Sequence, residues 1–436
     1  MIIQRRNQHC TESGERIGST VFMTRLTHAP EGTVRIGLLH LLYFLSFGFG
    51  VPFFTMYFST VLSDAGVSGV NQIVGGAIFL YNALGVLASP AAGYISDRFR
   101  IAEGILTFSA VAAMLAALLL VVPGFVDGLS GTAVSALILG GALVGGFFAR
   151  PLVPLINTET LQFLHRTDGN TAEYGRFRML GSAGFVVATA SAGFLITGTG
   201  HVATPIALHA AGFGLLAMVA GAKAHARPQP VRLPIEHLKG DRAIRRFLVF
   251  AFFASLGVNS AFLYTSLFLE EVGAGYIITG LALGAAALPE IPLMYHVGGF
   301  IRKVGVKPVI ATGVASQVLK LLLYAAFAGT PSTWIFILVS ALHGVGFALL
   351  YTGSVNYVES CSHPDLRATY QNLFALVWGS AVALGGPVSA LILDLWSSTA
   401  LMLLYALMLS VILGYFIFGV PVAEVAPAPA AGNDTD

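Results

Sequence analysis

Glu290 is an ionisable side chain inside a long apolar stretch, Thr279–Arg302, and it lies between Pro289 and Pro292. A charged residue at the centre of a membrane helix costs about 2.5–3.5 kcal/mol on insertion scales, so such a residue needs a partner or a wet cavity. Each proline also removes a backbone donor and loosens the helix beside the acid. This pattern predicts reversible protonation on an ion or proton path. The alternative is a neutral, hydrogen-bonded carboxyl group that packs one helix against another.

Two further titratable residues, Lys320 and His343, also lie inside apolar stretches. Lys320 lies about 8 residues from the outer end of its stretch and Glu290 about 14 from the outer end of its own, so at 1.5 Å per residue their depths differ by roughly 9 Å. Lys320 therefore either pairs with Glu290 or snorkels to the outer surface. His343 lies near mid-depth, where it either relays protons or contacts a substrate, or stays neutral and bonds a neighbouring helix. We interpret these three residues as candidates for proton coupling.

A second group of charged residues lies near the predicted internal helix ends. The segment Gly93–Arg100, GYISDRFR, combines a glycine that permits close helix approach with Asp97, which can pair with a base or cap a helix, and with Arg98 on the internal side. Arg150 lies near the inner end of its stretch, where it either snorkels inward, or binds an anionic substrate or Glu159. We predict a cytoplasmic gate that contains Gly93, Asp97, Arg98, Arg150 and Glu159.

Aromatic and amide side chains could line a substrate cavity between such helices. Tyr43 and Phe47 lie four residues apart and therefore share one helix face. That face either stacks on a ring-bearing substrate or takes part in ordinary helix packing. Asn82, Asn259 and Gln371 are polar groups in or at apolar stretches, so we predict that they are cavity-lining donors.

Membrane helices must position these residues, because 56% of the 436 residues are hydrophobic, only 10% are charged and the mean hydropathy is +0.80. Apolar stretches of spanning length recur with short gaps, and the longest polar gap, 222–243, is basic and divides them six and six. We predict an all-α polytopic membrane protein with a tail 1–33, a half 34–221, a central loop 222–243, a half 244–421 and a tail 422–436. The twelve predicted spans are 35–61, 70–95, 101–122, 132–155, 175–198, 202–221, 244–269, 276–300, 307–328, 332–355, 366–393 and 399–420.

The distribution of basic residues predicts the orientation of these spans. If the N-terminus is internal, all but two of the 23 Lys and Arg residues lie in internal segments, and the two exceptions, Arg150 and Lys320, lie within spans. The predicted external loops carry acids and no Lys or Arg, which fits the positive-inside rule. We therefore predict a multi-pass protein of the cell (inner or plasma) membrane, with both termini cytoplasmic and the lipid bilayer as a partner. Residues 1–33 lack the short apolar core of a signal peptide.

The sequence lacks the motifs of several other classes of protein. It has no P-loop, HExxH motif, nucleophile elbow or metal-spaced Cys and His residues, so we predict no enzyme activity, cofactor or metal site. Cys10 and Cys361 both fall in predicted internal segments, where a disulfide is not expected. The basic central loop is explained by orientation and by the anionic inner leaflet rather than by nucleic acid. We expect a monomer that handles a small-molecule substrate.

The loop GYISDRFR, placed after the second span, resembles the signature loop of the major facilitator superfamily. The segment Gly299–Lys303 echoes it after the eighth span, without the Asp. Within the superfamily the chain is similar to the branch of lactose permease-like, phenylpropionate permease-like and nucleoside–proton symporters. The stretches that carry this likeness, spread over residues 35–420, are YFLSFGFGVPFFTMYF, PLINTETLQFL with EYGRFRMLGSAGF, LGAAALPEIP, and LHGVGFALLYTGSVNYVESCSHPDLRATYQ.

The resemblance implies twelve helices in two six-helix bundles that rock about a midplane site. It also implies an acid in span eight, a base in span nine and a His-Gly pair in span ten, which fall on Glu290, Lys320 and His343-Gly344. Lys320 stands where Arg is more usual, which weakens a bidentate clamp, and Asn157 stands where an Asp often ends span four. We expect proton-coupled symport of a small organic solute, such as a saccharide, a nucleoside or an aromatic acid. The alternatives are proton-driven efflux of amphipathic compounds and a non-transporting membrane sensor.

Overall fold

The computed structural model describes residues 32–99, 102–167, 174–221, 242–362 and 367–421. Within these ranges, the side chains of 93–99, 102–103, 165 and 367–369 are outside the description. The gate residues Gly93, Asp97 and Arg98 therefore lie on a described helix, but their predicted contacts lie outside the described residues. Most of the predicted tails and central loop, at 1–31, 222–241 and 422–436, lie outside the described residues.

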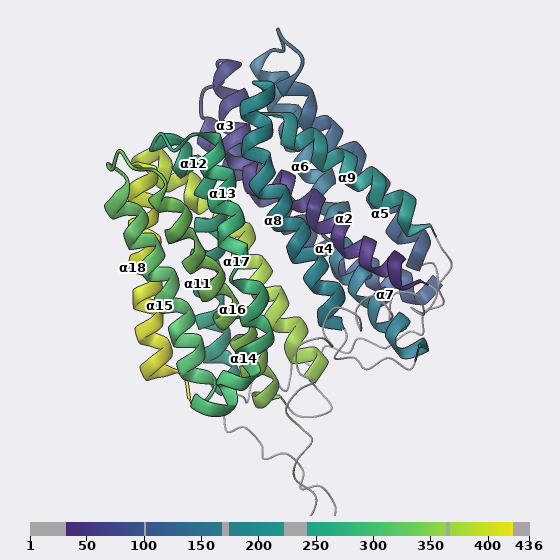
Figure 1. Ribbon diagram of the computed structural model, residues 1–436, viewed down its shortest axis with the longest axis vertical. Helices are drawn as coiled ribbons and strands as arrows, with labels where there is room; N and C mark the ends of the chain where they lie inside the picture. The colour runs from purple at the N-terminus through teal and green to yellow at the C-terminus, as the bar shows by residue number, and fades with distance from the viewer. Residues whose placement is uncertain (1–31, 100–101, 168–173, 222–241, 363–366, 422–436) are drawn as a thin grey trace, which may run out of the picture.

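The described residues form helices, which gather in two groups in Figure 1. The first group, coloured purple to teal, comprises α2 (Thr33–Gly50), η1 (Val51–Phe53), α3 (Phe54–Asp64), α4 (Val70–Phe99), α5 (Ala102–Val121), η2 (Val122–Gly124), α6 (Gly131–Ala149), α7 (Leu152–Arg166), α8 (Tyr174–Thr199) and α9 (Thr204–Ala220). The second group, coloured green to yellow, comprises α11 (Arg242–Leu263), α12 (Thr265–Glu271), α13 (Gly275–Ala287), α14 (Glu290–Val304), α15 (Val306–Phe327), α16 (Ile335–Cys361), α17 (Arg367–Leu395) and α18 (Ser398–Gly419). We call them the N-terminal and C-terminal halves.

Twelve helical segments match the twelve predicted spans. Eleven are long and apolar enough to cross a membrane by length and composition, and a shorter apolar helix, Thr204–Ala220, occupies the place of the sixth. The large apolar side chains that remain exposed, such as Met218 at 80% and Phe418 at 90%, are what a lipid-facing surface presents. The predicted all-helical membrane fold is therefore confirmed.

Three of the spans are interrupted near their middle, and a proline lies at each interruption. Pro52 lies in η1 between α2 and α3, Pro151 separates α6 from α7, and Pro289 separates α13 from α14. Proline has no backbone N–H and its ring disfavours a continuous helix. Two of these breaks bring a charged residue, Arg150 or Glu290, to a helix end inside an otherwise apolar span. The expected loosening of the helix beside Glu290 is thus present.

The two halves meet most closely at the end where α3 and α12 lie, at the top of Figure 1. There the hydroxyl of Thr55 donates to the carbonyl of Leu263 at 2.8 Å, and the amide of Asn71 donates to Asp394 at 2.9 Å. We call this the closed end. At the opposite end the ribbons of α7 and α14 stand apart (Figure 1).

Two helix pairs form the seam between the halves: α4 with α17, and α8 with α13. Both seams rely on glycine. A Cβ at Gly75 would lie 2.7 Å from the carbonyl oxygen of Gly386, and one at Gly280 would lie 2.7 Å from the carbonyl oxygen of Thr189. Backbones that approach this closely exclude any side chain, as is common in helix packing within membranes.

Candidate functional site

Glu290 is the first residue of α14 and is half-buried. Helix α16 lies directly against this break, because a Cβ at Gly344 would meet the carbonyl oxygen of Ala286 at 2.5 Å and the backbone nitrogen of Glu290 at 3.1 Å. The guanidinium of Arg178, on α8 of the other half, interacts electrostatically with Glu290. The predicted His-Gly pair and the predicted acid are therefore neighbours, and a cation of the N-terminal half acts on that acid.

Lys320 and His343 form a buried contact in the C-terminal half. The Nζ of Lys320 lies 3.3 Å from Nδ1 of His343, and the two residues are 1% and 8% exposed. A protonated lysine can only donate, so His343 then accepts on Nδ1 and carries its own proton on Nε2. The imidazole stacks between Phe262, at 4.5 Å, and Phe347, at 5.9 Å. Lys320 therefore does not extend to the outer surface, the alternative considered above.

Lys320 does not pair directly with Glu290 in this conformation. An ion pair within 4 Å joins two other residues, Arg35 and Glu159. His343 contacts Lys320 on one side, and its neighbour Gly344 contacts the backbone of Glu290 on the other. The three proton-coupling candidates are thus brought to one region by α16.

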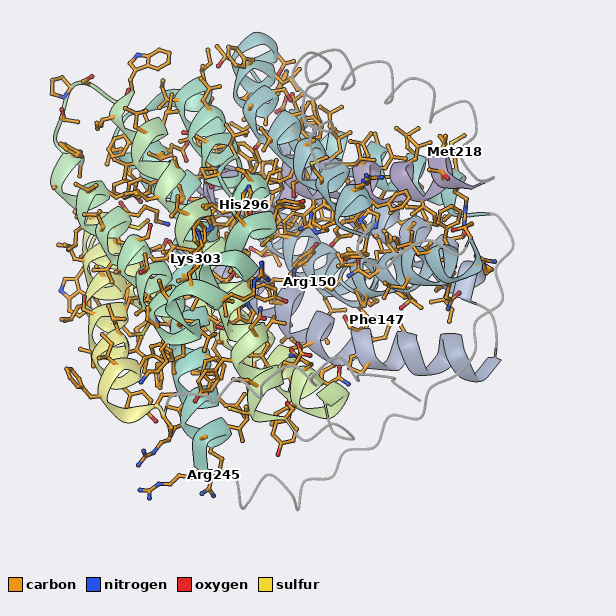
Figure 2. The ribbon with its side chains drawn as sticks, turned by 60° about the horizontal axis from the view of Figure 1, so that its bottom comes forward. Phe147, Arg150, Met218, Arg245, His296 and Lys303 are labelled. Atoms are coloured by element: carbon orange, nitrogen blue, oxygen red, sulfur yellow. The ribbon has the colours of Figure 1, made fainter. Side chains whose placement is uncertain are left out.

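Arg150 lies at the break between α6 and α7 and is half-buried. It appears near the centre of Figure 2, between helices of the two halves. Its Nη2 donates to Oδ1 of Asn82 at 2.5 Å, and its guanidinium carbon lies 5.8 Å from the ring centre of Tyr81. The side-chain amide of Asn82 in turn donates to the carbonyl of Ile78 at 2.8 Å. Asn82 therefore positions Arg150, rather than standing alone as a cavity donor.

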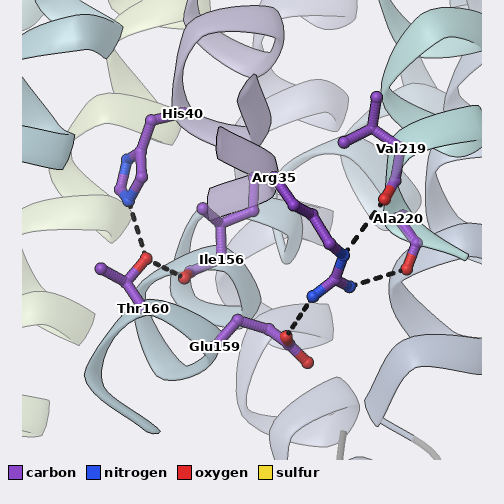
Figure 3. Close-up of polar contacts among 7 residues, drawn as sticks. All are labelled: Arg35, His40, Ile156, Glu159, Thr160, Val219 and Ala220. Carbon is purple, nitrogen blue, oxygen red and sulfur yellow. Dashed lines mark hydrogen bonds and ion pairs between the residues drawn. The ribbon is translucent and has the colours of Figure 1, made fainter. Parts of the chain in front are cut away.

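Glu159 belongs to a clamp within the N-terminal half (Figure 3). Its Oε2 accepts from Nη1 of Arg35 at 3.3 Å, and Arg35 also donates to the carbonyls of Val219 at 3.2 Å and Ala220 at 2.9 Å. Glu159 is only 3% exposed. Arg35 of α2 is thus joined both to Glu159 of α7 and to the last carbonyls of α9. Glu159 contacts Arg35, so the structure does not bring the two predicted gate residues Arg150 and Glu159 together.

The remaining cavity candidates lie in three places. Tyr43 and Phe47 stack with their ring centres 6.1 Å apart, which agrees with the shared face, and Tyr43 is buried. Asn259 donates within its own helix to Ser255, and Gln371 donates to the carbonyl of Val355 at 2.9 Å. Only Tyr43 lies near the charged centre of the N-terminal half, since it interacts electrostatically with both Arg150 and Arg178.

Arg178 was not predicted as a site residue, because it was counted among the internal basic residues. Its guanidinium carbon lies 4.0 Å from the ring centre of Phe44, and its Nη1 donates to Ser182 at 3.1 Å. Its charge acts on Tyr43 and also on Glu290 and Tyr351 of the other half. Arg178 therefore connects the two halves electrostatically. The available signal was its place inside the predicted fifth span, 175–198.

An aromatic cluster in the C-terminal half was also missed. Phe347 and Tyr351 stack in nearly parallel planes at 5.5 Å, and Trp378 packs against Tyr351 at 5.4 Å and against Phe374 at 5.5 Å. We call these four residues the aromatic wall. Because Tyr351 interacts with Tyr174 and Arg178 of α8, the wall faces the N-terminal half. Within the described residues, no group of three or more His, Cys, Asp or Glu side chains gathers as a metal site would require.

One family model and three known proteins resemble this chain. The model of the MFS_1-like family matches residues 33–405. The maltose permease of Geobacillus stearothermophilus is 26% identical over 78% of this chain and 82% of its own length. The uncharacterised transporter YwbF of Bacillus subtilis is 27% identical over 53% of this chain, and the match spans only 57% of YwbF. The crystal structure of the nucleoside transporter NupG superposes with a TM-score of 0.74 at 17% identity, covering 88% of this chain and 98% of that one.

The family match covers nearly every span, and the solved structure shares the fold. The proteins with stated activities among these relatives and neighbours are transporters rather than enzymes. The chain belongs to the MFS_1-like family and is a multi-pass membrane protein of the major facilitator transporter type.

Proposed function

We propose that this protein is a secondary active transporter that couples the uptake of a small organic solute to protons by alternating access. The observation that carries the proposal is the position of Glu290. This carboxyl group lies at a helix break inside a span, contacts the His-Gly segment of α16 through its backbone, and lies within the electrostatic reach of Arg178 of the other half.

The protonation state of Glu290 alters the interaction between the halves. The ionised carboxylate attracts the guanidinium of Arg178, and the protonated carboxyl does not. A ligand or proton shifts a two-state equilibrium by the difference in its free energy in the two states. Proton uptake at Glu290 therefore changes the relative stability of the two conformations. Lys320 and His343, joined by their own contact and linked to this acid through Gly344 of α16, would complete the coupling group.

The solute would bind between Arg178 and the aromatic wall. Arg178 supplies a planar donor that already stacks on Phe44, and the wall supplies a ring surface on the facing half. A saccharide, a nucleoside or an aromatic acid suits such a surface. The names of the maltose permease and of the nucleoside transporter agree with this range.

The gate would lie at the end of the molecule opposite the closed end. Gly93, Asp97 and Arg98 end α4 there, and the Arg35–Glu159 clamp holds the neighbouring ends of α2, α7 and α9. We further propose that both termini face the cytoplasm, that the protein resides in the inner or plasma membrane, and that it acts as a monomer. The orientation of the termini rests on the distribution of Lys and Arg.

Uptake into proteoliposomes tests the coupling role of Glu290. A panel of saccharides, nucleosides and aromatic acids is offered with and without an inward proton gradient. Wild-type protein should accumulate one class only with the gradient, whereas Glu290→Gln should equilibrate that solute without accumulating it. Glu271→Gln, at the exposed end of α12, is the matched control and should accumulate normally. Accumulation by Glu290→Gln as strong as that of wild type would remove Glu290 from the coupling role.

A further inference from the structure

A second arginine site lies in the N-terminal half, at the break between α6 and α7. We call Tyr43, Tyr81, Asn82 and Arg150 the Arg150 pocket. Arg150 donates one N–H to Asn82, and among the described residues no Asp or Glu side chain lies within ion-pair distance of it. A guanidinium carries five N–H donors and no acceptor. The neutral Asn82 oxygen satisfies one of these donors and leaves the positive charge without a counter-ion.

The backbone around the pocket is shaped to admit this cation. A Cβ at Gly85 would lie 2.6 Å from Cβ of Arg150, and a Cβ at Gly146 would lie 2.6 Å from Cα of Tyr81. The two glycines therefore allow α4 and α6 to approach closely while the arginine stem enters between them. Asn82 is anchored to the carbonyl of Ile78, which directs its oxygen toward Arg150.

The pocket also contains a buried donor without a partner. The hydroxyl of Tyr81 is buried, its residue is 2% exposed, and no hydrogen-bond partner is present among the described residues. Tyr81 interacts electrostatically with Arg150 and with Tyr43. Native structures rarely leave a buried hydroxyl unsatisfied, so an unpaired one beside an uncompensated cation indicates a missing acceptor.

The acids of the neighbourhood are engaged elsewhere. Glu159 pairs with Arg35, and Glu290 lies in the electrostatic field of Arg178. The part of the chain that the structure describes therefore offers no acidic acceptor to this site, and a bound ligand could supply one. A carboxylate accepts several hydrogen bonds, matches the planar fork of an arginine and is itself charged.

We propose that the Arg150 pocket binds the carboxylate of the transported solute, so that the substrate class is small organic anions. This inference rests on the proposed transport function. The body of the solute would then extend toward Arg178 and the aromatic wall. A monoanion that moves together with one proton transfers no net charge, so its uptake should depend on the proton gradient and not on the membrane potential.

Ligand-dependent thermal stabilisation of the purified full-length protein tests the substrate class. Monocarboxylates from acetate to phenylacetate and gluconate are each compared with the neutral amide of the same skeleton, together with inorganic phosphate and neutral sugars. At least one carboxylate should stabilise the wild type while its amide does not. Stabilisation by the amide equal to that by the carboxylate, by phosphate alone, or by neutral sugars alone would overturn the proposal.

Variants assign the binding to the pocket. Arg150→Gln should weaken carboxylate binding about 10- to 100-fold, the range expected for loss of a charge-assisted hydrogen bond. Arg150→Lys keeps the charge but loses the planar fork and should bind with intermediate affinity. Arg245→Gln, on the exposed first turn of α11, should bind like wild type. Unchanged carboxylate affinity in a folded Arg150→Gln, verified by size-exclusion chromatography, would overturn the site.

Transport separates this inference from the function on which it rests. Proteoliposomes are given an inward proton gradient with the membrane potential clamped at zero or at an inside-negative value. Equal accumulation of the carboxylate under both clamps is the expected result. Arg150-dependent binding without any gradient-driven accumulation would contradict symport and leave the anion site standing. Accumulation of a neutral sugar alone would support symport and contradict the anion site.

Discussion

Glu159 and Glu290 are two carboxylates inside the same membrane protein, and their surroundings differ in kind. Glu159 is almost fully buried and pairs with Arg35, which also holds the carbonyls at the end of α9. Glu290 is half-buried, begins a broken helix and has no cation within ion-pair distance among the described residues. The first arrangement fixes three helices to one another. The second leaves a carboxyl group whose charge acts on the opposite half, so the two carboxylates differ in both burial and partners.

Breaking the clamp should have the largest effect on stability. Arg35→Ala leaves the buried carboxylate of Glu159 without its counter-ion, so the free energy of unfolding should fall by about 3 kcal/mol. Glu290→Gln should not lower it, because no close ion pair is lost. Thermal unfolding of both variants in the same detergent measures the difference. If Glu290→Gln were the less stable of the two, the contrast between the carboxylates would be wrong.

Filling the space beside the break should be costly in both stability and transport. Gly344→Ala places a methyl group against the carbonyl of Ala286 and the backbone of Glu290, where overpacking costs about 1–3 kcal/mol. Gly414→Ala in α18 is the matched control, since nothing lies within 4 Å of a Cβ there. Initial uptake rates and melting temperatures compare the two. Normal transport by a folded Gly344→Ala would show that Glu290 tolerates movement of α16.

A smaller loss should follow from weakening the polar contacts around the clamp. Thr160→Val removes the hydroxyl that lies 2.9 Å from Nε2 of the buried His40, and a lost hydrogen bond of this kind costs about 1 kcal/mol. Thr158→Val lies on the exposed face of the same helix and bonds only its own backbone, so it is the control. Denaturation midpoints of the two variants should differ in this direction. Equal midpoints would show that the contact between Thr160 and His40 does not contribute to stability.

A third carboxylate, Glu270 at the closed end, should give a defined pH dependence of stability. Burial and the neighbouring Glu271 raise the pKa of Glu270 to about 7. The folded protein therefore holds this proton more tightly than the unfolded chain, in which the pKa is about 4.5. The free energy of unfolding should fall as the pH rises from about 4.5 to about 7 and then level off. Glu270→Gln should flatten that slope, and an unchanged slope would assign it to another group.

The spans could be predicted from the sequence because they have a local cause: in lipid, a long apolar stretch can satisfy its backbone groups only as a helix. The breaks could be predicted only in part, because Pro289 lies at a break whereas Pro90 and Pro387 lie inside continuous helices. The family resemblance likewise placed Glu290, Lys320 and His343 in neighbouring spans. The contact of Lys320 with His343 was not predicted, because the alternatives considered for Lys320 were a pair with Glu290 and the outer surface.

The partners of the charged groups could not be predicted. Helices that are apolar on every side carry no amphipathic pattern, so the sequence does not show which face turns inward. Arg178 was therefore interpreted only as evidence of orientation. Arg150 was predicted as a possible partner of Glu159, whereas in the structure it donates to Asn82. The pairing of Arg35 with Glu159 joins residues 124 positions apart, which no local rule reveals.

The glycine seams carry a mechanical consequence. Where Gly75 meets Gly386 and Gly280 meets Thr189, main chain lies on main chain and no rotamers interlock. If one half tilts against the other, no side chain has to leave a packed position at these two contacts. Resistance to movement between the halves should therefore come from the hydrogen bonds at the closed end. A methyl group added at Gly75 or Gly280 should hinder that movement.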